Sequence, residues 1–223
     1  MLTKYGLPQI IIFPVHIAAL MAIIFIFQPL GMVFVIIAEP VLFMVLIWTM
    51  MFFRNPPRKI SLDENVLLSP ADGTITDISE TEHPDIDGKA LRIGMFLSIF
   101  NVHLNRMPCS ARVESTHYRK GRFKNAMSAD SGRVNESNEV LMTRLVEPKD
   151  RLIVRQVSGA IARHIVCKAE PGKDYTQGYA FGMIKFGSRT ELYLPLRDGS
   201  YDIVIKIGDR VNAGLSPLIV YKK

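Results

Sequence analysis

Three short segments of the 223-residue chain carry side chains that together could activate a hydroxyl nucleophile. Ser188 follows Gly187 between two apolar runs, Asp72 lies in a Ser-Pro-Ala-Asp-Gly turn, and His103 lies in a polar loop. A histidine can take the proton of a serine, and a carboxylate can orient the histidine and stabilise its charged form. Because Gly187 has no Cβ, the Ser188 hydroxyl can approach the preceding carbonyl closely. These residues provide the groups that an intramolecular attack of Ser188 on the Gly187 carbonyl would need.

Each of these features also has an ordinary structural explanation. A Gly-Ser pair between strands is commonly a turn, and an aspartate before a glycine commonly starts one. A lone histidine is commonly a surface residue or a hydrogen-bonded core residue. The residue types therefore leave two hypotheses, a serine-based catalytic site and three unrelated structural positions.

The net charge of the chain lies outside its N-terminal quarter. Lys4 and Glu39 are the only charged residues before Arg54 and they cancel, so the net charge of +6 belongs to the rest. A basic region beside a bilayer attracts anionic lipid headgroups. Nucleic acid is the other common partner of a basic surface, but the sequence has no base-stacking motif, zinc knuckle or Lys/Arg tract. The composition therefore favours anionic membrane lipid over nucleic acid.

Two apolar runs near the N-terminus predict a helical membrane hairpin. Residues 10–27 contain no charged side chain, and residues 32–53 contain only Glu39. Each run approaches the roughly 20 residues that cross the hydrocarbon core, and a Gln-Pro-Leu-Gly turn joins them. Because this connector is short, a re-entrant hairpin is the alternative. We expect His16 and Glu39 to be neutral or paired with each other rather than catalytic.

The cations around the hairpin predict its orientation. Lys4 precedes the two runs, Arg54 and Arg58 follow them, and the connector is uncharged. By the positive-inside rule, both ends lie in the cytoplasm and the hairpin lies in the cell (inner) membrane. We therefore expect a membrane anchor over residues 1–53 and a β-rich domain over residues 54–223 on the cytoplasmic side.

The rest of the chain alternates short apolar runs with turn residues, which predicts a mainly β fold. Expected strands cover 66–78 around a turn, then 90–97, 111–117, 139–145, 152–157, 160–167, 182–186, 191–194, 202–207 and 215–221. Residues 124–138, rich in Ser, Asn, Asp and Gly, indicate a long loop. Residues 207–215 have the Gly-x-x-Val-x-x-Gly rhythm of lipoyl-type β-sandwiches. We expect a barrel or sandwich of short strands with a lipoyl-like motif, preceded by the transmembrane hairpin.

The two cysteines predict no cross-link. Cys109 and Cys167 stand far apart, with no CxxC or Cys/His ligand spacing. We therefore expect neither a disulfide framework nor a zinc site, and reduced thiols in a cytoplasm-facing domain.

Six short blocks occur in an order and spacing that resemble one enzyme family. They are Phe-Arg-Asn-Pro-Pro-Arg at 53–58, Ser-Pro-Ala-Asp-Gly at 69–73, Asn-Val-His-Leu-Asn-Arg-Met-Pro at 101–108, Asn-Glu-Ser-Asn-Glu at 135–139, Gly-Ala-Ile-Ala-Arg at 159–163 and Phe-Gly-Met-Ile-Lys-Phe-Gly-Ser-Arg at 181–189. On these blocks the chain resembles the phosphatidylserine decarboxylase proenzymes of the short, membrane-anchored, pyruvoyl-dependent type. The likeness covers nearly all of the expected β domain.

The resemblance implies a carboxy-lyase that is made by self-cleavage. Ser188 would attack the Gly187 carbonyl to form an ester, and β-elimination would cut the chain into residues 1–187 and 188–223, with Ser188 becoming a pyruvoyl group. The two fragments would form a heterodimer. With the pyruvoyl group as electron sink, the enzyme would decarboxylate phosphatidylserine to phosphatidylethanolamine without pyridoxal phosphate or a metal.

The resemblance also assigns roles to Asp72 and His103, which would act with the serine in processing. His103 would return a proton to the substrate α-carbon after carbon dioxide leaves. Large bacterial relatives have a second histidine where this chain has Arg106, so His103 must serve both steps or share them. His117 and His164 are candidates for sharing, although both fall in expected strands, where a structural role is commoner.

A headgroup phosphate needs cationic partners. The expected ones are Arg106, Arg119, Lys120 and Arg122. A solvated basic face is the alternative explanation of these four residues.

Other functions stay open on the sequence alone. One is a non-enzymatic membrane adaptor, whose β domain binds lipid headgroups or a partner and whose Gly-Ser pair is an ordinary turn. Another is a decarboxylase of an archaeal ether-lipid serine analogue, which would differ only in the lipid tails. A lipoyl or biotinyl carrier is excluded because the modifiable lysine hairpin is missing. Exposed strand edges favour further dimerisation.

Overall fold

The computed structural model describes residues 1–28, 31–122, 134–159, 164–185 and 188–222. The chain divides into two compact units, Met1–Pro57 and Arg58–Lys223. Gly187, the first part of the expected strand at 160–167 and most of the expected loop at 124–138 lie outside the described residues.

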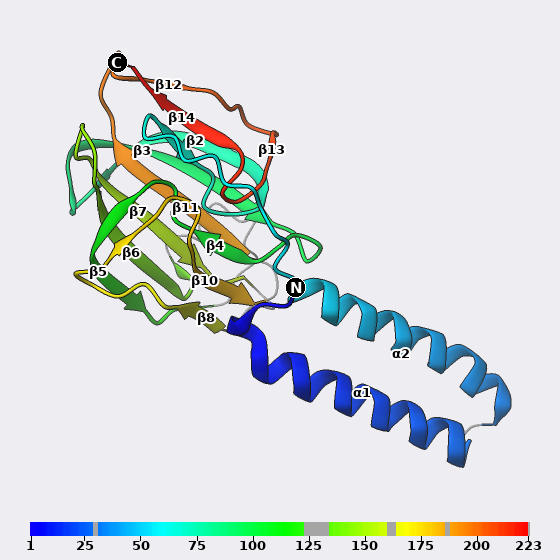
Figure 1. Ribbon diagram of the computed structural model, residues 1–223. Helices are drawn as coiled ribbons and strands as arrows, with labels where there is room; N and C mark the ends of the chain where they lie inside the picture. The colour runs from blue at the N-terminus through cyan, green and yellow to red at the C-terminus, as the bar shows by residue number, and fades with distance from the viewer. Residues whose placement is uncertain (29–30, 123–133, 160–163, 186–187, 223) are drawn as a thin grey trace. The chain divides into compact units, whose positions relative to one another are not determined.

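The N-terminal unit is a pair of apolar helices (Figure 1). A short 3₁₀ turn, η1 (Lys4–Gly6), leads into α1 (Leu7–Phe27), and α2 (Met32–Phe52) follows. Each α-helix has 21 residues and is therefore about 32 Å long, enough to cross a hydrocarbon core. Both helices are sufficiently apolar to do so, which confirms the predicted pair of apolar helices. Inside α1, the His16 ring donates to the Ile12 carbonyl at 2.8 Å, as expected of a structural histidine.

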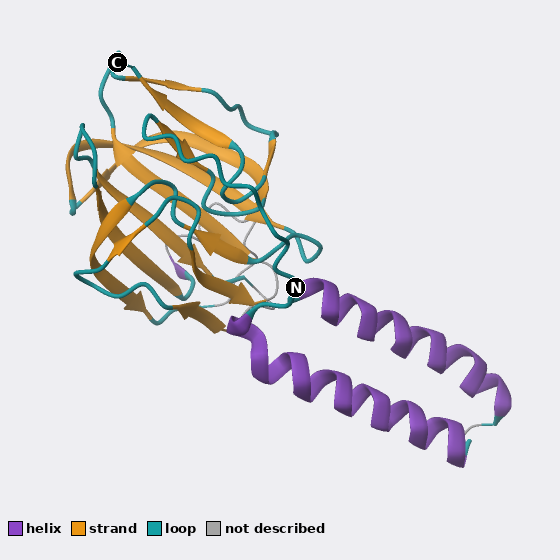
Figure 2. Cartoon of the chain, viewed as in Figure 1, coloured by secondary structure: helices purple, strands orange, loops and turns teal. Residues whose placement is uncertain are grey.

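The second unit is built from antiparallel strands (Figure 2). Those within the described residues are β1 (Val66–Leu68), β2 (Gly73–His83), β3 (Ile86–Leu97), β4 (Leu104–Arg106), β5 (Ala111–Arg119), β6 (Ser137–Arg144), β7 (Arg151–Val157), β8 (His164–Cys167), β9 (Asp174–Tyr175), β10 (Ala180–Lys185), β11 (Ser188–Pro195), β12 (Tyr201–Ile203), β13 (Arg210–Val211) and β14 (Pro217–Tyr221). They form a curled eight-stranded sheet in the order β13-β2-β3-β11-β7-β6-β5-β9 and two three-stranded sheets, β4-β10-β8 and β1-β14-β12.

The alternation of side chains along β11 separates a core face of the large sheet from a charged face. Leu192 and Leu194 are fully buried in a hydrophobic core to which β10 and β14 also contribute. On the other face, Arg189 bonds to Glu191 at 2.8 Å and to Asp77. By the same alternation, Ser188 and Thr190 belong to the core face.

The charged face depends on a missing side chain in β3. A Cβ on Gly94 would lie 2.0 Å from the Arg189 guanidinium and 2.1 Å from the Asp77 carboxylate. Because Gly94 has no side chain, the Arg189–Asp77 ion pair can cross β3 at this position.

The mainly β architecture confirms the sequence prediction. The predicted strands at 90–97, 111–117 and 152–157 lie within β3, β5 and β7. The prediction missed β4, β9 and β13, which have two or three residues each. Strands this short do not show the alternation by which a strand is recognised.

Candidate active site

Ser188 begins the strand at the middle of the large sheet. It pairs with Leu97 of β3, and the following residue, Arg189, pairs with Val157 of β7. Ser188 is fully buried, and its Oγ forms no hydrogen bond within the described residues. A buried hydroxyl without a partner destabilises a fold. Ser79 and Ser158 also have such an oxygen, so Ser188 is distinguished by the combination of an unbonded hydroxyl with its position directly after Gly187.

His103 lies in the loop between β3 and β4 and is also fully buried. Its Nδ1 is 3.0 Å from the Asn101 carbonyl oxygen. Because a carbonyl only accepts, Nδ1 carries the hydrogen and the lone pair of the neutral ring is on Nε2. Nε2 is thus the atom at which this ring can take a proton. The His103 carbonyl accepts from the Ile184 amide at 3.1 Å, which links the histidine to β10.

A buried amide network connects β4, which directly follows His103, with β11, which begins at Ser188. Asn105 Nδ2 donates to Thr190 Oγ1 at 2.9 Å, and Gln156 Nε2 donates to Asn105 Oδ1 at 2.9 Å. Asn138 Nδ2 then donates to Gln156 Oε1 at 3.1 Å. Asn105 and Thr190 each follow a predicted catalytic residue by two positions. Their hydrogen bond therefore fixes β4 against β11 near both.

Asp72 is held by an arginine and a backbone amide. Arg58 donates from Nη1 to Oδ1 at 2.7 Å and from Nη2 to Oδ2 at 2.8 Å. The Ala213 amide donates to Oδ1 at 2.8 Å. The bond to His103 Nδ1 that we expected from Asp72 is made by the Asn101 carbonyl. Asp72 therefore braces the turn after Ser69 against the β13–β14 loop, and its catalytic role stays a prediction.

Removing the arginine of this pair tests how much the turn depends on it. The Arg58 and Asp72 side chains are only 6% and 7% exposed, so Arg58→Gln leaves a buried carboxylate without its counter-charge. We expect a loss of about 3–5 kcal/mol in the free energy of unfolding, measured by denaturant unfolding of the full chain in detergent. Arg112→Gln, which removes an exposed ion pair with Asp174, is the matched control and should change stability little. Equal stability of the two variants would contradict the argument.

The four predicted phosphate-binding cations have different surroundings. Arg106 Nη1 donates to the Gly178 carbonyl at 2.9 Å, and Arg119 lines a pocket on the charged face of the large sheet. Lys120 and Arg122 follow β5 and are exposed. Their role in substrate binding stays a prediction.

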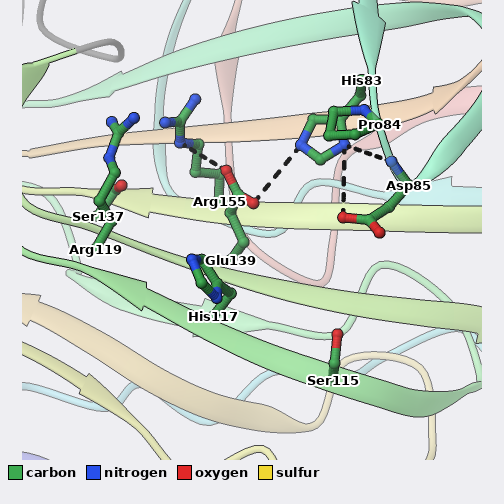
Figure 3. A pocket seen from close by; sticks show the side chains of 9 residues that line it. All are labelled: His83, Pro84, Asp85, Ser115, His117, Arg119, Ser137, Glu139 and Arg155. Atoms are coloured by element: carbon green, nitrogen blue, oxygen red, sulfur yellow. Dashed lines mark hydrogen bonds and ion pairs between the residues drawn. The ribbon is translucent and has the colours of Figure 1, made fainter.

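The pocket that contains Arg119 has a volume of about 590 Å³ (Figure 3). At its centre, Glu139 lies 3.1 Å from Arg155 and 3.6 Å from the His83 ring. Burial alone would raise the pKa of Glu139, but the His83 hydrogen bond and the Arg155 charge outweigh it and lower this pKa. His117 also lines this pocket. This candidate for the second histidine therefore lies on the sheet face opposite to that of the Ser188 side chain.

The other histidine candidate, His164, is exposed on β8, opposite Lys185 of β10. Lys185 is 5% exposed, and burial lowers the pKa of its ammonium group because the charged form loses hydration.

Within the residues that the structure describes, no group of three or more His, Cys, Asp or Glu side chains is placed to hold a metal.

Sequence reasoning missed the roles of Arg58, Asn105 and Thr190. Arg58 and Asn105 both lie inside sequence blocks that resemble the family, at 53–58 and 101–108. Their partners stand 14 and 85 positions away. Nothing in a linear pattern pairs residues at such separations.

Comparisons with known proteins identify the relatives of this chain. The family model described as phosphatidylserine decarboxylase matches residues 45–218. A phosphatidylserine decarboxylase proenzyme of Rhodopirellula baltica is 40% identical over 223 residues, covering 99% of this chain and 88% of the relative. A proenzyme of the same name from Carboxydothermus hydrogenoformans is 39% identical over 175 residues, covering 78% and 80%. One from Desulfotalea psychrophila is 40% identical over 168 residues, covering 75% and 76%.

The match spans both the strand that begins at Ser188 and the segment that carries His103. It also includes the turn that places Asp72. The chain belongs to the phosphatidylserine decarboxylase family.

Proposed function

We propose that this protein decarboxylates phosphatidylserine to phosphatidylethanolamine, using a pyruvoyl group that it makes from its own Ser188. The observation that carries the proposal is that Ser188, which is fully buried and whose hydroxyl has no hydrogen-bond partner within the described residues, directly follows a glycine at the start of β11. The proenzyme names of the relatives support it, since a proenzyme needs a processing step. The adaptor hypothesis gives no role to a processing step.

Processing would be a serinolysis carried out by the chain itself. Ser188 Oγ attacks the Gly187 carbonyl carbon, the peptide C–N bond breaks, and an ester replaces it. A base then removes the Cα proton of residue 188, and the Gly187 carboxylate leaves. Water hydrolyses the resulting enamine through its imine form, which releases ammonia. His103 Nε2 is the proposed acceptor of the serine proton, because its Nδ1 already donates to Asn101.

The site fits the group that this reaction would form. Ser188 contributes a reactive side chain but no described hydrogen bond to the fold, so converting it removes no such structural contact. The pyruvoyl group supplies an electrophilic carbonyl that withdraws the electrons left when carbon dioxide departs. The chain contributes a buried, water-poor position at the start of β11 and a histidine that can hold a proton at Nε2 and return it to the substrate carbon.

The two fragments would stay associated after cleavage. The segment from residue 188 onward contains β11, which lies between β3 and β7 of the first fragment. The same segment also contains β13 and β14, which pair with β2 and β1. The proposed heterodimer is therefore held by strand pairing and the shared core.

The apolar helices supply the proposed membrane location. With both ends of the hairpin beside cations, the catalytic unit would face the cytoplasm from the cell (inner) membrane. Membrane attachment would restrict the search for a lipid substrate to two dimensions.

Intact-mass analysis of the purified protein tests the proposal. We expect a C-terminal fragment of residues 188–223, thus 36 residues, that begins with a carbonyl, reacts with hydroxylamine and resists Edman sequencing. Vesicles containing carboxyl-labelled phosphatidylserine should release labelled carbon dioxide when this protein is added. An uncut chain that binds such vesicles without releasing carbon dioxide would contradict the proposal and support the adaptor.

A further inference from the structure

Arg189, the residue directly after Ser188, donates hydrogen bonds from all three of its guanidinium nitrogens. Nε donates to Glu191 Oε1 at 2.8 Å, and Nη1 donates to Thr76 Oγ1 at 2.8 Å. Nη2 donates to the Asp77 carboxylate. Because Arg189 is only 7% exposed, water competes little for these bonds. This arrangement, called here the Arg189 clamp, joins the start of β11 to β2 across β3.

Two neighbouring strands depart from regular structure where the clamp lies. In β3, Gly94 leaves the space through which the guanidinium passes. In β2, the register against β3 shifts between Ile75 and Asp77, as in a β-bulge, which adds one residue to one strand. Ile75 and Ile78 both pack against the core, so the shift lets the two side chains between them, Thr76 and Asp77, lie together on the charged face.

The clamp is part of a larger buried charge network. Burial alone would lower the pKa of Arg189, but the negative charges of Glu191 and Asp77 outweigh it and raise this pKa, which keeps the guanidinium charged. Glu191 also accepts from the Tyr193 hydroxyl at 2.6 Å and lies 3.7 Å from Arg155 of β7. The network therefore contains a second largely buried arginine, which lies on a different strand from Ser188.

Ser188 lies where the strand pairing of β11 becomes one-sided. Among the described residues, the pairing of β11 with β7 ends at Arg189 and Val157, whereas its pairing with β3 continues to Ser188 and Leu97. Cleavage before residue 188 would turn this one-sided position into a chain end, and chain ends fray unless they are tied down. The clamp ties down the side chain of the next residue.

We propose that Arg189 is a positioning residue that holds residue 188 in place, before cleavage as the attacking serine and after cleavage as the carbonyl end of the smaller fragment. The inference rests on the proposed function. The Arg189 side chain lies on the sheet face opposite to that of the Ser188 side chain, so it acts through the backbone and does not contact the reacting atoms.

Two substitutions of Arg189 measure this positioning. Arg189→Lys keeps a positive charge between the two carboxylates but replaces three directed N–H groups by one ammonium. We expect it to slow cleavage by about 10- to 100-fold, because a misplacement of about 1 Å can cost that much. Arg189→Gln, which also removes the charge, should slow cleavage further. Pulse-labelled protein gives both rates.

Kinetics of the cleaved protein test the second part of the proposal. On mixed phosphatidylserine–phosphatidylcholine vesicles, cleaved Arg189→Lys should have a kcat reduced by about 10-fold or more. Its KM should stay within a few-fold of the wild-type value, because the clamp holds the reacting end of the chain and not the lipid.

Arg155→Gln is the matched control for a merely structural role. It removes a largely buried cation near the same Glu191 and should therefore lower the stability of the domain as well, while leaving cleavage and kcat at wild-type values. Hydrogen exchange followed by mass spectrometry separates the two effects. In Arg189→Lys, the amides at the start of the C-terminal fragment should exchange faster, while those of β6 and β14 keep their wild-type rates.

The outcomes that contradict the argument differ from one another. Wild-type cleavage and kcat in both Arg189 variants, beside a cleaved and active wild type, would refute the clamp alone. Equal losses in Arg189→Lys and Arg155→Gln, with faster exchange in all strands, would show a general effect on stability and also overturn it. A wild type that neither cleaves nor releases carbon dioxide would refute the proposed function itself.

Discussion

Replacing Ser188 with alanine is expected to leave the chain as one uncut polypeptide and to abolish decarboxylation, by about 10⁴-fold or more. Without the hydroxyl oxygen no ester can form at Gly187, and without the ester no carbonyl group can arise at residue 188. The fold should survive, because Ser188 Oγ makes no hydrogen bond within the described residues and an alanine fits the same buried space. Denaturing gels with intact mass measure cleavage, and release of labelled carbon dioxide measures activity.

A second serine provides the matched control. Ser79 on β2 also has a buried hydroxyl oxygen without a described hydrogen bond, but it pairs with Arg92, well away from the start of β11. Ser79→Ala should cleave and decarboxylate like the wild type. If Ser188→Ala were cut at the same bond, or released carbon dioxide at the wild-type rate, the serinolysis mechanism would be wrong.

Replacing His103 with glutamine is expected to slow cleavage, decarboxylation or both by about 10²- to 10⁴-fold, the usual contribution of a positioned acid or base. The glutamine amide can still donate to the Asn101 carbonyl, as His103 Nδ1 does at 3.0 Å, so the loop should keep its shape. An amide cannot take a proton at neutral pH, which isolates the proton-transfer role from the structural one.

The two steps can be measured separately. Pulse-labelled protein gives the rate of cleavage, and the carbon dioxide release per cleaved molecule gives the rate of decarboxylation. Loss in one assay alone would assign His103 to that step and require another group for the other. His83→Gln, in the pocket on the opposite sheet face, is the control and should change neither rate. Wild-type values for both rates in His103→Gln would remove His103 from the mechanism.

The candidate reactive residues could be proposed from the sequence, but their connections could not. The Gly-Ser pair, the Asp-Gly turn and the histidine loop are local patterns with recognisable neighbours. Which groups they bond to depends on packing across the fold. Asp72 was expected to orient His103, but its carboxylate is bound by Arg58 and Ala213. A bidentate arginine satisfies a buried carboxylate better than a single imidazole hydrogen can.

The sequence by itself determined the apolar helical pair, the mainly β character of the remainder and the family. These properties follow from apolar runs, alternations and short ordered blocks, each of which is continuous in the chain. Only the tertiary structure decided that β11 lies between β3 and β7, that Thr190 bonds to Asn105, and that Arg58 pairs with Asp72. The physical reason is that these contacts join segments far apart in the chain. Burial and hydrogen-bond satisfaction over the whole domain select them, and no local pattern encodes that selection.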